Sequence, residues 1–141
     1  MKHIALLTIL SALPPLVALA ETHEVQMYTR NGQGAMIYEP EFLKIAPGDA
    51  VRFIPVQSGH NAAIIDGMLP LGAVPFKSQI NEEFTVTLTV PGSYGIKCSP
   101  HFAMGMVMLI QVGDIPQADF PADLPRRAKD RFTAILARET E

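Results

Sequence analysis

The sequence predicts a mainly β protein, an antiparallel β-sandwich followed by a C-terminal helical extension. Residues 84–90 alternate apolar and polar side chains, which is the period of a strand with one buried face. Other short runs of strand composition are separated by Pro and Gly turns with no helical stretch between them, which is typical of a sandwich. Helical spacing of apolar residues begins only after Gly113, so the chain divides into a β part and a helical tail.

The first twenty residues have the pattern of a secretory signal peptide. A short positive start, Met1-Lys2-His3, precedes a mostly apolar stretch, and Ala18-Leu19-Ala20 is a small-x-small cleavage site. We therefore expect residues 1–20 to be removed and the exported chain to begin at Glu21. A retained membrane anchor is the alternative, and the short span with Pro14-Pro15 in its middle argues against it.

Length, charge and cysteine content limit the organisation of the chain and its partners. The 141 residues predict one domain, residues 21–141, in which residues 21–113 form the sandwich and residues 114–141 the helical extension. The formal net charge of −3 argues against nucleic acid as a partner. No stretch after the leader reaches transmembrane length, so we expect no membrane association after cleavage. A single cysteine cannot form an internal disulfide, so the core must hold the fold unaided.

Six runs have the composition of strands, and turn signals separate them. They are residues 25–29, 42–45, 51–56, 84–90, 93–98 and 106–112. Turn chemistry lies at residues 30–34, at Pro47-Gly48-Asp49 and at Pro91-Gly92. Residues 66–76, punctuated by Gly and Pro, predict an irregular segment. The last run is nearly all apolar, as expected for a central strand of a sandwich.

The tail predicts one amphipathic helix. Its apolar residues fall at helical spacing: Ala128, Phe132, Ile135 and Leu136. Asp123 is the candidate N-cap, and Pro125 is tolerated in a first turn. A short helix at residues 117–120 would precede it. We interpret this helix as a packing element that covers one face of the sandwich.

The stretch from Gly95 to Met106 carries the chemistry of the chain. It contains the only cysteine, Cys98, with His101 three residues later and Met106 five residues beyond that. Thiolate, imidazole and thioether are soft ligands that suit copper better than magnesium or calcium. A second histidine would complete the His₂Cys set with a weak axial methionine that defines a blue-copper electron-transfer site, and His60 is the candidate.

Other interpretations of these residues stay open at this point. Cys98 could be a buried small apolar residue, or it could act with His101 as a nucleophile and its base. The two intervening residues favour one shared ion over a substrate placed between the side chains. Zinc is less suited, because structural zinc sites use several cysteines and a thioether is a poor zinc ligand. Met104, Met106 and Met108 are alternative axial ligands or core residues. Four protein ligands would leave no open position for a substrate, so we do not expect an enzyme.

The ligand pattern also carries a family resemblance. Gly59-His60-Asn61, followed by Cys98-Ser-Pro-His101 and then Met106 after four further residues, resembles the pattern of cupredoxins, the small blue copper proteins. Within that family the chain is similar to pseudoazurins. The supporting segments are Gly34-Ala35-Met36, Pro47-Gly48-Asp49, Ala103-Met104-Gly105-Met106 and the helical C-terminal extension.

The resemblance implies the fold and the roles of individual residues. It implies a Greek-key sandwich and a type 1 copper ion held by His60, Cys98, His101 and Met106, because the family spacing selects Met106 among the methionines. Asn61 would tie its loop to the cysteine loop by hydrogen bonds, which orient metal ligands. Met36 would pack close to His101 without binding the metal.

The resemblance further implies a periplasmic carrier of single electrons that cycles Cu(II) and Cu(I). Its partners would be a c-type cytochrome as donor and a copper nitrite reductase or related oxidoreductase as acceptor, which links the chain to denitrification. A monomer would dock transiently through an apolar patch near His101, formed by Pro100, Phe102 and Ala103, although burial is the competing interpretation for Phe102. The basic residues that could surround the patch are Arg30, Lys77 and Lys97. A copper carrier or storage protein with the same ligands is the alternative, and a cysteine-dependent enzyme is a further one.

Overall fold

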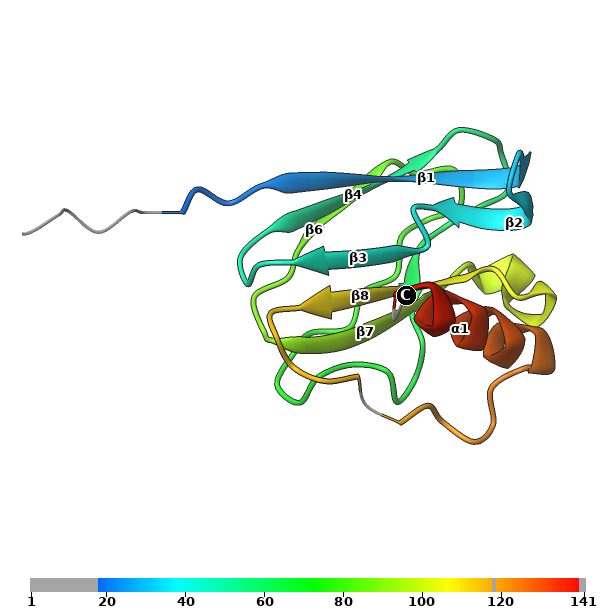
Figure 1. Cartoon of the computed structure of the whole chain (residues 1–141). Coiled ribbons are helices and arrows are strands. Elements are labelled where there is room, and N and C mark those ends of the chain that lie inside the picture. Colours follow the sequence, from blue (N-terminus) through cyan, green and yellow to red (C-terminus); the bar gives the residue numbers. More distant parts are fainter. Residues whose placement is uncertain (1–17, 118, 140–141) are drawn as a thin grey trace, which may run out of the picture.

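Two four-stranded sheets face one another in this computed structural model, which describes residues 18–117 and 119–139 (Figure 1). The first sheet has the order β2-β1-β4-β6. Its strands are β1 (Thr22–Asn31), β2 (Gly34–Glu39), β4 (Ala50–Pro55) and β6 (Phe84–Thr87). The second sheet has the order β3-β8-β7-β5. Its strands are β3 (Phe42–Ile45), β5 (Ala63–Ile64), β7 (Gly92–Lys97) and β8 (Val107–Val112).

The predicted mainly β sandwich is confirmed, and the strand directions need one correction. Of the six strand pairings within the described residues, four are antiparallel, but β1 runs parallel to β4 and β3 runs parallel to β8. The chain leaves the first sheet at the end of β2 and enters the second at β3 with only residues 40–41 between them. Alternation of side chains reports which face of a strand is buried and carries no information about the direction of its neighbour.

All six predicted strand runs contain a strand, and two strands were missed. The two-residue β5 is too short to show a period, and β2 buries the adjacent residues Ile37 and Tyr38 instead of alternating. Within β2 the backbone of Met36 has a left-handed φ of 56°, which interrupts the regular pleat. Residues 66–76 contain no strand, as expected.

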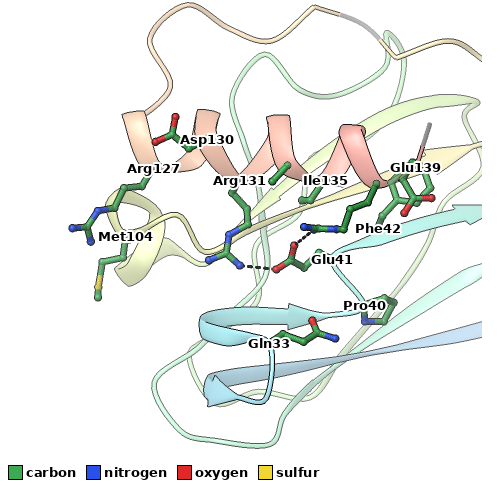
Figure 2. Close-up of a pocket in the computed structure, with 12 residues that line it drawn as sticks. Gln33, Pro40, Glu41, Phe42, Met104, Arg127, Asp130, Arg131, Ile135 and Glu139 are labelled. Carbon is green, nitrogen blue, oxygen red and sulfur yellow. Dashed lines mark hydrogen bonds and ion pairs between the residues drawn. The ribbon is translucent and has the colours of Figure 1, made fainter. Parts of the chain in front are cut away.

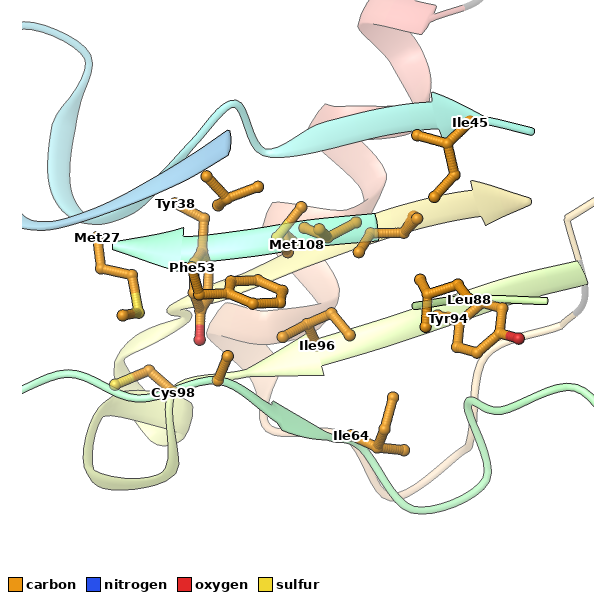
Figure 3. Packing of buried hydrophobic residues seen from close by; sticks show 14 of the residues in the cluster. Met27, Tyr38, Ile45, Phe53, Ile64, Leu88, Tyr94, Ile96, Cys98 and Met108 are labelled. Carbon is orange, nitrogen blue, oxygen red and sulfur yellow. The ribbon is translucent and has the colours of Figure 1, made fainter. Parts of the chain in front are cut away.

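Strand β8 lies at the centre of the packing because both of its faces are buried. Met108, Ile110 and Val112 point into the main core between the sheets, where they meet Tyr38, Phe53 and Ile96 (Figure 3). Val107 and Leu109 point the other way, into a second cluster under the C-terminal helix. This two-sided burial explains why the strand is an almost continuous apolar run.

The predicted amphipathic helix is α1 (Arg126–Glu139), and it covers the outer face of the second sheet (Figure 1). Ala128, Phe132 and Ile135 form its buried face. Glu41 lies between β2 and β3, and its carboxylate oxygens form ion pairs with the guanidinium nitrogens of Arg131 at 2.5 Å and Arg138 at 2.7 Å (Figure 2). These contacts fasten α1 across the point where the chain changes sheets.

The start of α1 differs from the prediction. The carbonyl of Pro125 accepts a hydrogen bond from the Lys129 amide at 3.0 Å, so Pro125 holds the N-cap position and Asp123 lies outside the helix. Leu124, two residues before the helix, is buried in the second cluster. The described residues 117, 119 and 120 are not helical, so the predicted short helix at 117–120 is wrong.

Most of the predicted leader, residues 1–17, lies outside the described residues, and cleavage after Ala20 stays a prediction. Residues 18–20 are exposed and have no regular structure before β1 begins. In the parts of the chain that the structure describes, no helix combines the length and the apolar content needed to cross a bilayer.

Candidate metal centre

The four predicted ligands lie in two loops, one between β4 and β5 and the other between β7 and β8. His60 lies in the loop between β4 and β5, and Cys98 follows directly after β7. His101 lies within η1 (Ser99–Met104), a 3-10 helix with a kink at this residue, and Met106 directly precedes β8. Strand pairing between β7 and β8 brings the two ends of the cysteine loop together, because Lys97 is opposite Val107.

Three ligand atoms converge on one point. The sulfur of Cys98 lies 3.7 Å from Nδ1 of His60 and 3.5 Å from Nδ1 of His101, and the two nitrogens are 3.2 Å apart. An ion about 2.0 Å from each nitrogen and about 2.3 Å from the sulfur would separate ligands in a plane by about 3.5 to 3.7 Å. The side chains therefore have nearly the spacing of a metal-bound set, and their donor chemistry fits copper.

Burial differs among the predicted ligands. His60, Cys98 and Met106 are each 0 % exposed, whereas His101 is partly exposed. The hidden ligands keep water away from the point of convergence. His101 is the ligand whose ring connects that point with the surface.

The structure separates the three candidate methionines. Met104 is 44 % exposed and lines a surface hollow together with Arg127 (Figure 2). Met108 lies inside β8 in the main core. Met106 is bound through its backbone to both loop ligands, since its carbonyl accepts from the Cys98 amide at 3.0 Å and its amide donates to the His101 carbonyl at 3.2 Å. Met106 is thus adjacent to the site on geometric grounds, and its role as axial ligand stays a prediction.

Asn61 joins the two ligand loops, as the resemblance implied. Its side-chain oxygen accepts a hydrogen bond from the Ser99 amide at 2.7 Å, and its side-chain nitrogen donates to the Ser99 hydroxyl and to the Ser78 carbonyl, each at 3.1 Å. Asn61 is 1 % exposed, so water does not replace these contacts. Asn61, the residue after His60, is therefore hydrogen-bonded to Ser99, the residue after Cys98.

Two further positioning residues were not found from the sequence. The hydroxyl of Thr29 in β1 lies 2.9 Å from Nε2 of His60, and this hydrogen bond orients the ring so that Nδ1 faces Cys98. The hydroxyl of Tyr38 in β2 donates to the Asn61 carbonyl at 2.6 Å. A threonine and a tyrosine in strands carry no local signal for such roles, because their contacts form only when the sheet assembles.

Burial also affects the protonation of two predicted ligands, His60 and Cys98. Desolvation, followed by the neighbouring His101, holds the pKa of His60 below its usual value, so its ring is neutral and able to bind metal. Desolvation raises the pKa of the Cys98 thiol. A metal ion that binds Cys98 would therefore have to displace the thiol proton. This requirement favours ions with a high affinity for thiolate.

Helix α1 supports the ligand loop from outside. Gly105, at the end of η1, has a left-handed φ of 86°, and a Cβ at this position would lie 2.8 Å from the carbonyl oxygen of Arg127. The backbone of α1 thus rests directly on the loop that carries His101 and Met106. Helix α1, which was predicted to be a packing element, therefore also contacts the loop that carries two of the predicted ligands.

The surface around His101 matches the predicted patch in part. Pro100 and Ala103 are exposed, whereas Phe102 is only partly exposed and also packs against the cluster under α1, so each interpretation of Phe102 holds in part. The ammonium group of Lys97 lies 5.1 Å from the centre of the Phe102 ring. Lys77 and Lys97 line the same surface hollow beside Ser99 and Phe102.

Two remaining predictions concern Arg30 and Met36. Arg30 is exposed, and its backbone amide and carbonyl are hydrogen-bonded to the side chain of Gln57, near the His60 loop. Met36 packs against the main core, and its contact with His101 stays a prediction.

Comparison with known proteins supports this interpretation of the site. Residues 25–113 match the family model described as copper binding proteins, plastocyanin/azurin family. The pseudoazurin of Paracoccus pantotrophus is 46% identical over 142 residues, which cover 97% of this chain and 98% of that protein. The pseudoazurin of Methylorubrum extorquens is 40% identical over 99 residues, which cover 70% of this chain and 67% of that protein.

Solved structures show the same similarity. The crystal structure of native pseudoazurin from Hyphomicrobium denitrificans has a TM-score of 0.73 and 32% identity, and the match covers 83% of this chain and 97% of that one. Refined pseudoazurin from Methylobacterium extorquens AM1 has a TM-score of 0.71 and 33% identity, with 82% and 98% covered. The chain therefore belongs to the plastocyanin/azurin family of copper-binding proteins, as a cupredoxin similar to the pseudoazurins.

Proposed function

We propose that His60, Cys98, His101 and Met106 bind one type 1 copper ion and that the chain carries single electrons between larger redox proteins in the periplasm. Membership of the cupredoxin family makes the chain a blue copper electron carrier and not an enzyme. The observation that supports the ligand set is the convergence of one buried thiol and two imidazole Nδ1 atoms within 3.7 Å of one another.

The residues around the site hold the ligands nearly fixed. A bound copper ion would supply the one-electron couple between Cu(II) and Cu(I). Asn61 locks the two ligand loops together, and Thr29 fixes the ring of His60. Little movement on electron transfer means a low barrier, and the partly exposed His101 ring offers the shortest covalent route from the site to a partner.

A visible spectrum of the mature protein tests the ligand set. After addition of Cu(II) and removal of the excess, we expect an intense thiolate-to-copper band that disappears on reduction and is absent in Cys98→Ser. Met106→Leu should shift the band and raise the reduction potential, because a weak axial ligand tunes both. Met108→Leu is the matched control, since Met108 is equally buried but lies inside β8. A colourless protein with an intact thiol would contradict the assignment, and equal effects of the two methionine variants would remove Met106 from it.

For its partners we propose a c-type cytochrome as donor and a copper nitrite reductase or related oxidoreductase as acceptor, in denitrification. A monomer would dock transiently around His101. Exposed Pro100 and Ala103 supply apolar contact area, and Lys77 and Lys97 lie together beside the cysteine loop. An acidic partner surface would be steered toward these lysines.

Stopped-flow electron transfer at several salt concentrations tests this docking surface. Lys77→Glu and Lys97→Glu should slow the second-order rate with a copper nitrite reductase and weaken its dependence on salt. Lys44→Glu is the control. In the β3–β8 register Lys44 is opposite Gln111, near the end of β8 that is remote from the cysteine loop. Equal rates for all three variants would contradict docking near His101.

A further inference from the structure

A second cluster of possible ligands lies at the start of β1. The backbone nitrogen of Glu21 donates to Oδ1 of Asp49 at 3.0 Å, and Nε2 of His23 lies 2.9 Å from Oδ2 of the same carboxylate. Figure 1 shows the start of β1, in blue, at the end of the sandwich opposite the yellow segment that contains η1. The strand register agrees, because Thr22 pairs with Ala50 at the beginning of β4, and His60 follows the other end of that strand. This cluster is therefore separate from the copper ligands.

Cleavage after Ala20 would change the chemistry of this segment. Glu21 would then carry a free α-amine, and His23 would be the third residue of the chain. An amine, the two following amide nitrogens and the imidazole Nδ1 of a third-position histidine form adjoining chelate rings around one plane. Cu(II) and Ni(II) favour this square-planar nitrogen set, whereas zinc favours a tetrahedral one.

The backbone of this segment is free on one side. Strand β2 pairs with β1 only from Gln26 onward, so residues 22–25 have a neighbour in β4 and none in β2. The contact of Nε2 with Asp49 leaves Nδ1, the ring nitrogen nearer the backbone, available. The His23 side chain is 24% exposed. A metal ion would need to lift only residues 21–23 from the end of β4.

We propose that removal of the leader creates a second metal site, which binds Cu(II) or Ni(II) through the Glu21 α-amine, the amide nitrogens of Thr22 and His23, and Nδ1 of His23. The site rests on cleavage after Ala20 and is independent of the copper ligands proposed above. Without the metal ion, the Asp49 carboxylate holds residues 21–23 against the sheet through its contacts with the Glu21 nitrogen and His23. Metal binding breaks these contacts. A rival arrangement would use carboxylates, because ligand atoms of Glu21, His23 and Asp49 lie within 4.8 Å of one another.

Copper titration of the exported protein tests the proposal. The full precursor is exported with its own leader, the N-terminus is identified by mass spectrometry, and the type 1 site is loaded first. We expect the chain beginning at Glu21 to bind one further Cu(II), with a weak ligand-field band, four-nitrogen hyperfine structure in electron paramagnetic resonance, and an unchanged blue band. His23→Ala should lose this second binding step, and excess Zn(II) should not compete for it.

A chain that begins at Ala20 is the matched control, because it keeps every side chain of the cluster and moves His23 to the fourth position. It should lose the second binding step, whereas Asp49→Asn should retain it or bind Cu(II) more tightly. Retention of the step in the chain beginning at Ala20, or its loss in Asp49→Asn, would establish the carboxylate arrangement and overturn the proposal. An exported chain that begins at any residue other than Glu21 would also overturn it. The blue band is recorded in every sample, so failure at Cys98 is distinguished from failure at the N-terminus.

Discussion

Replacing Asn61 by alanine should both destabilise the protein and loosen its metal site. The substitution removes three hydrogen bonds, two to Ser99 and one to the Ser78 carbonyl. Asn61 is buried, so the Ser99 amide loses its partner without gaining water in exchange. The link between the His60 loop and the Cys98 loop is then absent.

The size of the effect follows from the number of hydrogen bonds that the alanine cannot make. Three hydrogen bonds at about 1 kcal/mol each correspond to a decrease of about 3 kcal/mol in the free energy of unfolding. For a domain of this size each kcal/mol lowers the melting temperature by roughly 4 °C, so a decrease of roughly 12 °C is expected for the metal-free protein. Loss of a residue that orients metal ligands lowers copper affinity by about 10- to 100-fold.

Urea unfolding of the metal-free protein and competition with a copper chelator measure these two quantities. Ser99→Ala is the matched control, because it removes only the hydroxyl partner of Asn61 and keeps the backbone amide bond. It should cost about 1 kcal/mol, a third of the larger effect. If Asn61→Ala destabilises the protein no more than Ser99→Ala does, the hydrogen bonds between the loops do not hold the site together.

Three further substitutions test the positioning of His60, the packing of α1 and the titration of a buried tyrosine. Thr29→Val removes the partner of His60 Nε2 and should lower copper affinity by about 10- to 100-fold in chelator competition, whereas Thr29→Ser should restore it. Phe132→Ala should cost about 3 to 5 kcal/mol in urea unfolding, because Phe132 is 0 % exposed, while the exposed control Thr133→Ala should change stability by less than about 1 kcal/mol. Burial raises the pKa of Tyr94 above its usual 10.0, so its contribution is present below pH 10 and is lost as the pH rises through the higher folded value. Tyr94→Phe should therefore reduce the loss of stability measured in alkaline unfolding.

Each of these expectations has an outcome that contradicts it. Equal copper affinities in Thr29→Val and wild type would mean that the hydroxyl does not orient His60. A decrease of less than about 1 kcal/mol in the free energy of unfolding for Phe132→Ala would mean that the cluster under α1 contributes little to stability. An unchanged alkaline profile in Tyr94→Phe would assign that loss of stability to other groups, such as the buried Tyr38.

Local patterns predicted most of the fold and the residue types of the site. Alternation located β6 because its neighbours bury one face only, and the unbroken apolar run located β8 because both of its faces are covered. Cys98, His101 and Met106 lie within one short loop, so their proximity follows from covalent spacing. His60 is 38 residues before Cys98, and its place beside the sulfur was expected from the family pattern before the structure placed Nδ1 at 3.7 Å.

The sequence by itself determined six of the eight strands, the segment that forms the amphipathic helix, and the side chains that have the chemistry to bind copper. Tertiary structure alone decided that β1 runs parallel to β4 and β3 to β8, that α1 starts at Arg126, and that Thr29 and Tyr38 contact the His60 loop. The division has one physical reason. Side-chain period and ligand chemistry are properties of neighbouring residues, whereas strand direction, helix start and support of the ligands depend on contacts that exist only after distant segments have packed together.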